Sequence, residues 1–237
     1  MAETAWEVRE HGPMKPLAEN LWWVSGSLPR MSLRRTMTVA RLANGDLVLY
    51  SAIAMDEPSM RALEALGRPA WLVVPNAGHR LDAAKYKARY PDLKVVGPPG
   101  GRKGIEEEVA VDVLASEATL SGDSVRFELP RGIAEAEVEM IVRSDDGTTV
   151  VLNDVMFNMD PKADWLGWAI TSVLGSAPGP RVSRLSKWMF VKDQAALRAE
   201  FERWAALPDL VRVIVSHEKV ASGPEARAAL LRAASYL

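Results

Sequence analysis

Three side chains that can bind a metal ion each follow a predicted buried strand. His79 comes after the apolar run WLVV, Asp154 after TVVLN and His217 after VRVIVS. In layered α/β proteins the ends of neighbouring strands meet at one edge, so residues far apart in the sequence converge there. Two imidazoles and a carboxylate form a known ligand set for zinc or iron. The sequence therefore predicts a His79, Asp154 and His217 site for at most one divalent ion, with Asp154 and His217 as the catalytic candidates.

Each of these residues also has a purely structural interpretation. His217 can be a histidine at the edge of the core that bonds a loop, Asp154 can accept backbone N–H groups where its strand ends, and His79 can cap a helix. Asp82 is a candidate further ligand in the same turn. His11 lies in a charged N-terminal segment and is expected to be solvated.

The elements that must position these residues alternate between strands and helices. Short apolar runs bounded by Gly, Pro, Asn or Asp predict strands at 21–24, 37–42, 46–53, 71–74, 93–97, 149–153 and 211–216. Helical periodicity predicts helices at 56–66, 81–90, 193–206 and 224–236. Asn44-Gly45 and Asp146-Gly147 predict hairpin turns. We therefore expect one α/β domain over residues 1–237, with two packed sheets flanked by helices.

Composition excludes several classes of function. The chain has no cysteine, which removes disulfides, thiolate metal ligands and cysteine nucleophiles. Its formal charge of −2 gives no broad attraction to nucleic acid or to a membrane surface. No signal-like or membrane-spanning stretch occurs, so the expected location is the cytoplasm and the expected partner a small molecule.

Two other segments invite a functional interpretation. GPPGGRKG at 97–104 resembles a phosphate-binding loop but lacks the required spacing, and we expect an ordinary mobile loop. The segment 160–188 carries Trp165, Trp168 and Trp188. Its helices either cap the core with packed tryptophans or form a lid over a cleft.

The order of these elements, with VVLNDVMFN and the late VIVSHEKV, resembles the metallo-β-lactamase superfamily over nearly the whole chain. More narrowly, ENLWWV, RTMTVARLANGDLVLYSAI, LEALGRPAWLVVPNAGH, YPDLKVVGP and LNDVMFN are similar to the DUF4336 branch of that fold. The resemblance implies a four-layer αββα sandwich with a metal site at one edge of the sheets. In active members it also implies hydrolysis by metal-bound hydroxide.

The superfamily's first ligand turn, His-x-His-x-Asp-His, is not kept. In an ungapped overlay, the four ligand positions of that turn are occupied by Asn76, Gly78, Arg80 and Leu81. A shift by one residue brings His79 onto the second histidine but moves Leu81 onto the aspartate, so at best one of the four ligands is kept. No histidine occurs at 129–137, where the next ligand is expected. An Arg80 beside the site would also repel a metal ion.

The leading expectation is therefore a degenerate metallo-β-lactamase-fold protein, a hydrolase-like cleft without the dizinc ligand set. Such a protein binds fewer than two ions and hydrolyses β-lactams and thioesters no faster than background. Two alternatives stay open. One is a mononuclear metallohydrolase using His79, Asp154 and His217, and the other is a non-catalytic module that binds a small molecule or a protein through the tryptophan-rich segment.

Overall fold

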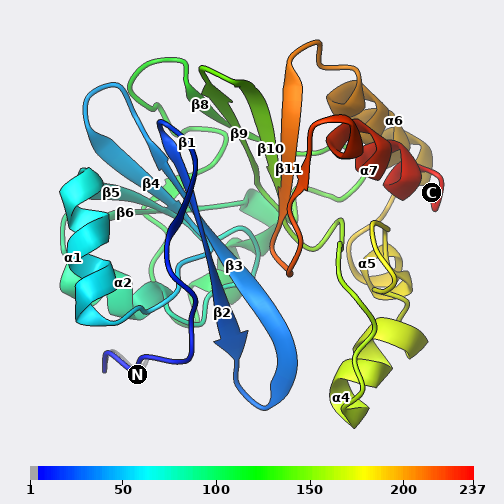
Figure 1. Cartoon of the computed structure of the whole chain (residues 1–237), viewed down its shortest axis with the longest axis horizontal. Helices are drawn as coiled ribbons and strands as arrows, with labels where there is room; N and C mark the ends of the chain where they lie inside the picture. The colour runs from blue at the N-terminus through cyan, green and yellow to red at the C-terminus, as the bar shows by residue number, and fades with distance from the viewer. Residues whose placement is uncertain (1–4) are drawn as a thin grey trace.

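The computed structural model describes residues 5–237 as two β-sheets packed face to face between helices (Figure 1). The first sheet follows chain order: β1 (Lys15–Ala18), β2 (Leu21–Leu28), β3 (Met31–Arg41), β4 (Asp46–Tyr50), β5 (Arg68–Val73), β6 (Lys94–Gly97) and β7 (Val113–Leu114). The second has the order β12 (Ala221–Ser222), β11 (Leu210–Val215), β10 (Gly147–Leu152), β9 (Glu139–Ser144) and β8 (Val125–Glu128). The predicted pair of sheets is confirmed.

Helices cover both outer faces. The first sheet is covered by α1 (Glu57–Leu66) and α2 (Ala83–Arg89), and the second by α6 (Gln194–Ala205) and α7 (Pro224–Ala234) (Figure 1). All four lie close to their predicted positions. The shorter elements are a 3₁₀ turn (Pro99–Gly101), α3 (Arg102–Ile105), α4 (Trp165–Trp168), a π turn (Ala169–Val173) and α5 (Arg184–Met189). Within residues 5–237, no helix is long and apolar enough to cross a membrane.

Three apolar cores separate the four layers. In β4, Leu47 and Leu49 pack toward α1 and α2, whereas Val48 and Tyr50 pack between the two sheets. This alternation follows from the two-residue period of a strand. In β10 the same alternation places Val151 between the sheets and its neighbours against α6 and α7. The predicted αββα sandwich is confirmed.

Both predicted hairpins are present, and the turn of the first lies at the predicted residues. Asn44-Gly45 joins the antiparallel strands β3 and β4, and Gly45 has φ +83°, a conformation that glycine adopts without strain. The Asn44 side chain accepts from the backbone N–H of Asp46 at 3.1 Å, which stabilises this turn. β9 and β10 are also antiparallel, but their turn is Asp145-Asp146, one residue before the predicted position, because Gly147 already pairs with Ser144.

Two local predictions are wrong. The segment 97–104 forms helical turns instead of a mobile loop. A Cβ at Gly100 would lie 2.6 Å from the Ala134 carbonyl, so glycine is needed there for close packing.

The ring of His11 is not solvated: Nε2 accepts from the N–H of Asp56 at 3.0 Å, and Nδ1 lies 2.9 Å from the Gly12 carbonyl. These backbone contacts hold the imidazole against the chain.

Candidate functional site

The topology brings the three predicted ligands to one edge of the sandwich. β10 and β11 are parallel neighbours in which Leu152 pairs with Val215. Asp154 and His217 each lie two residues beyond these paired positions, so they leave the sheet side by side. His79 comes from the turn after β5 in the other sheet, and it reaches the same edge.

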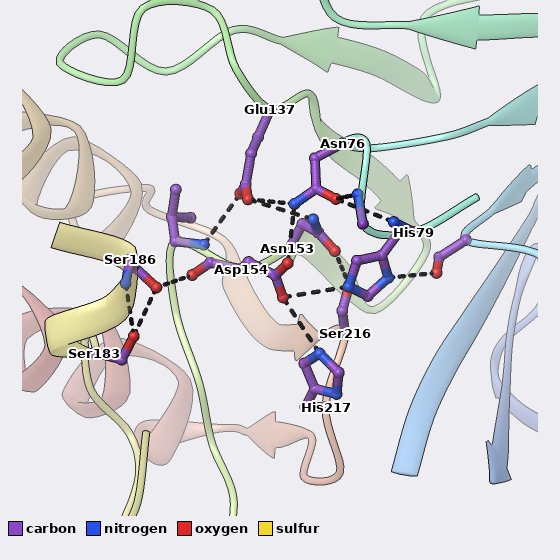
Figure 2. A network of polar contacts seen from close by, with 12 residues as sticks. Asn76, His79, Glu137, Asn153, Asp154, Ser183, Ser186, Ser216 and His217 are labelled. Carbon is purple, nitrogen blue, oxygen red and sulfur yellow. Dashed lines mark hydrogen bonds and ion pairs between the residues drawn. The ribbon is translucent and has the colours of Figure 1, made fainter. Parts of the chain in front are cut away.

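The three side chains meet around one carboxylate oxygen. Asp154 Oδ1 lies 3.2 Å from His79 Nε2 and 3.3 Å from His217 Nε2 (Figure 2). One potential ligand atom from each residue lies within 4.8 Å of the others. The predicted convergence of His79, Asp154 and His217 is therefore present, while their role as metal ligands or catalytic residues stays a prediction.

The far nitrogen of each imidazole is held by a second partner. His79 Nδ1 lies 2.9 Å from Ser51 Oγ, and His217 Nδ1 lies 2.9 Å from the Arg34 carbonyl oxygen. Because a carbonyl only accepts hydrogen bonds, His217 carries a proton on Nδ1. In the neutral ring, the Nε2 lone pair of His217 then faces the carboxylate of Asp154. Two acceptors at this distance need a cation between them, either a proton or a metal ion.

Asp154 and His217 shift each other's pKa values in opposite directions. Burial alone would raise the pKa of Asp154, but the charge of His79 and the hydrogen bond from His217 hold it well below its usual range. For His217, burial opposes the charged form, yet the hydrogen bond and charge of Asp154 leave its pKa above the usual value. Without metal, both shifts favour a proton on His217 and a negative charge on Asp154. A divalent ion would replace that proton.

Asn76 orients the carboxylate of Asp154. Its Nδ2 donates to Asp154 Oδ2 at 2.9 Å and to Glu137 Oε1 at 2.8 Å (Figure 2). Its Oδ1 accepts from the backbone N–H groups of Gly78 at 2.7 Å and His79 at 3.1 Å. Asn76 thus fixes both the turn that carries His79 and the oxygen that Asp154 presents to the histidines.

Two further buried carboxyl groups lie behind this site. Burial, reinforced by the charge of Asp154, raises the pKa of Glu137 to about 8. Burial and the charge of Glu137 raise the pKa of Glu139 well above its usual value. The shifts of both glutamates favour the neutral form, whereas the shift of Asp154 favours the ionised form.

Replacing Asn76 with alanine is expected to lower the free energy of unfolding by about 1–3 kcal/mol, because buried carboxylate oxygens and N–H groups lose their partner. Urea denaturation measures the change. As a control, Asn158→Ala removes an exposed bond from the Asn158 amide to the Lys219 carbonyl and is expected to cost less. Equal losses in the two variants would contradict the orienting role of Asn76.

Two expectations about the first turn are wrong. Arg80 pairs with Glu107 at 2.7 Å and does not line the pocket, so it is not an uncompensated cation beside the site. Asp82 is no ligand, because it is buried in an ion pair with Arg35. In both cases the ion-pair partner, Glu107 for Arg80 and Arg35 for Asp82, lies in a different segment of the chain.

A largely apolar pocket opens over the three residues. Its volume is about 460 Å³, and His79, Asp154 and His217 supply much of its polar lining. Most of the remaining wall is apolar, including Leu33, Leu81, Phe157, Ile170, Leu185 and Phe190. A pocket of this size and composition suits a small molecule with an apolar portion.

The tryptophans of the 160–188 segment are not packed into the core. Trp165, Trp168 and Trp188 are 79%, 53% and 82% exposed, so the packed alternative is wrong. Ile170 and Leu185 from the same helices face the pocket and form one of its walls. The segment borders the cleft, as the lid alternative requires, but its indole rings point to solvent.

Several residues that build the site carried no clear sequence signal. Ser51 directly follows β4 and adopts φ +58°, an uncommon conformation for serine, next to His79. Arg34 contributes only its carbonyl group, which any residue type could supply. Glu137 lies in the region where a ligand histidine was expected, and its acidic character was the one available hint.

No protein-family model matches the chain, and no curated protein matches it. Solved structures do. A DIM-1 metallo-β-lactamase exposed to ceftazidime is 12% identical, with a TM-score of 0.64 over 97% of this chain and 99% of that one. The metallo-β-lactamase from Pontibacter korlensis is 12% identical, with a TM-score of 0.61 over 96% and 100%. The mono-zinc form of FIM-1 from Pseudomonas aeruginosa is also 12% identical, with a TM-score of 0.59 over 98% of both chains.

These likenesses show that the chain has the metallo-β-lactamase fold. At this level of identity they carry no information about substrate. The narrower resemblance to DUF4336 is not confirmed and stays a prediction.

Proposed function

We propose that the protein is a hydrolase of the metallo-β-lactamase fold that uses a single divalent ion held by His79, Asp154 and His217. The observation that carries this proposal is the contact between His217 Nε2 and Asp154 Oδ1, two acceptors that need a cation between them. Hydrogen bonding of the far ring nitrogen, as seen for both histidines, is the usual way in which proteins orient metal-binding imidazoles.

The ligand set supports one ion and not two. None of the residues at the four ligand positions of the superfamily's first turn is available to a second ion. The amide group of Asn76 is hydrogen-bonded to neighbouring groups, Gly78 has no side chain and Leu81 is apolar. Arg80 is paired elsewhere. In the part of the chain that the structure describes, no second group of three histidine or carboxylate ligands comes together. The dizinc ligand set is therefore incomplete, and we assign the activity to His79, Asp154 and His217 with one ion.

The residues of the chain have distinct tasks in this proposal. An ion bound here would polarise a carbonyl group and lower the pKa of a coordinated water. Ser51 and the Arg34 carbonyl keep the two imidazoles aimed at the ion, and Asn76 holds Asp154 in place. The apolar walls exclude bulk water and bind the acyl part of the substrate.

The pocket favours esters or thioesters with an apolar acyl chain. The solved neighbours are named as metallo-β-lactamases, but β-lactams are polar carboxylates that match this apolar wall poorly. We therefore expect β-lactam hydrolysis at the background rate. For thioesters, in contrast to the expectation from the missing ligands, we expect hydrolysis above background, because a single bound ion would lower the pKa of a coordinated water.

A series of p-nitrophenyl esters and acyl thioesters of increasing chain length tests the proposal. We expect kcat/KM to rise by up to about fourfold per added methylene that the pocket buries, from about 0.8 kcal/mol each. Activity should disappear after chelation and return with zinc or iron. His217→Ala should abolish it, whereas the matched variant His11→Ala, at a histidine outside the pocket, should not.

The second candidate is a non-catalytic binding module, which the exposed tryptophans beside the cleft favour. A protein that binds one ion and the apolar acyl compounds but hydrolyses none of them would support this candidate. That outcome would overturn the hydrolase.

A further inference from the structure

Exposed apolar side chains are concentrated on the segment that forms one wall of the pocket. Most of the large hydrophobic residues that are exposed among residues 5–237 lie on α4, the adjoining π turn and α5: Trp165, Trp168, Val173, Trp188 and Met189. We call these five residues the tryptophan face. Met189 also lines the pocket, as does the exposed Leu81. Single exposed apolar residues are ordinary, but a cluster of this kind marks an interaction surface.

The two helices form one connected unit at the edge of the molecule. Backbone N–H groups of Arg184 and Leu185 bond to the Leu174 carbonyl, which ties the start of α5 to the end of the π turn. α4 projects away from the sandwich, with α5 beside it (Figure 1). Because Ile170 of the π turn and Leu185 of α5 line the pocket, this unit forms one of the pocket walls.

The charge around the tryptophan face is positive. Residues 160–192 carry five basic and two acidic side chains, a net charge of +3 in a chain whose total is −2. Arg184 and Lys192 are exposed, and in the described part of the chain neither has a carboxylate within ion-pair distance. The overall negative charge, which led to the expectation of no membrane partner, does not describe this surface.

We propose that the tryptophan face docks on the surface of an anionic lipid bilayer and holds the pocket mouth against it. Tryptophan partitions to the boundary between lipid headgroups and acyl chains. Nearby Lys and Arg side chains add attraction to anionic headgroups. The face combines both features, and the apolar pocket beside it opens where acyl chains would be available.

A second copy of the chain is a poorer occupant. In a symmetric dimer the same face would meet itself, which would bring two positively charged segments together. Anionic lipid headgroups neutralise the charge that a second copy would repel. The surface therefore fits a lipid better than itself.

Binding of the full chain to vesicles tests this proposal without any assay of hydrolysis. We expect co-sedimentation with vesicles of phosphatidylcholine and phosphatidylglycerol, weaker binding to phosphatidylcholine alone, and a loss of binding at high salt. Tryptophan emission should shift to shorter wavelength when anionic vesicles are added. The combined variant Trp165→Ser, Trp168→Ser and Trp188→Ser is expected to bind at least about tenfold more weakly.

Arg184→Glu with Lys192→Glu is likewise expected to weaken binding at least about tenfold. Matched controls lie on α6 and α7: Leu231→Ser removes another exposed apolar residue, and Arg198→Glu with Arg232→Glu reverses two other exposed charges. Neither control should change vesicle binding, and circular dichroism should show all variants folded. Equal binding by wild type and the tryptophan variant, or no binding by wild type, would overturn the proposal. So would a wild-type dimer in sedimentation that the tryptophan variant dissociates.

Discussion

Replacing Asp82 with alanine is expected to lower the free energy of unfolding by about 3–5 kcal/mol. The Asp82 carboxylate pairs with Arg35 and with Lys85, the latter at 3.0 Å, and it accepts from the Ala54 N–H at 3.0 Å. Arg35 and Lys85 are both buried, so the substitution leaves two cations without an anion away from water. Equilibrium denaturation in urea measures the loss.

Asp160→Ala is the matched control for this variant. Asp160 pairs with Lys219 at the surface, and its removal is expected to cost at most about 1 kcal/mol. A small loss in both variants would show that Asp82 does not compensate its buried partners.

The same network predicts how stability depends on pH. Burial alone would raise the pKa of Asp82, but Arg35 and the N–H of Ala54 hold it below its usual value. Stabilisation from Asp82 is therefore complete above the ordinary carboxyl range and is lost as pH falls through the lowered pKa.

Replacing Asp154 with alanine is expected to weaken zinc binding at least about a hundredfold, because only two imidazoles remain where three ligands converged. Asp154 is the shared partner of both histidines, so its loss also frees their orientation. Competition with a chromophoric chelator measures the affinity. Asp160→Ala should bind zinc like the wild type, and an equal loss in both variants would contradict the assigned ligand.

The positions of the ligands could be predicted because strand patterns are local. Val-rich runs indicated β10 and β11, and the residues just beyond their ends had to emerge at one edge. The ion-pair partners of the Arg80 and Asp82 side chains could not be predicted in the same way. Their partners, Glu107 and Arg35, lie on other elements, and no local spacing indicates such contacts.

Asn76 shows a different limit. An overlay on the superfamily turn indicates only that a histidine is missing there. The structure adds that Asn76 joins Asp154 to Glu137, which depends on three segments meeting. The exposure of Trp165 and Trp188 also depends on tertiary structure, because a short helix does not reveal which of its sides will be covered.

The central claim is a single divalent ion on His79, Asp154 and His217, and the metal content of the purified protein tests it most directly. Elemental analysis after purification without chelator is expected to give one zinc or iron ion per wild-type chain and none in His217→Ala or Asp154→Ala. Two tightly held ions per wild-type chain, no ion at all, or one ion retained in both variants would contradict the account.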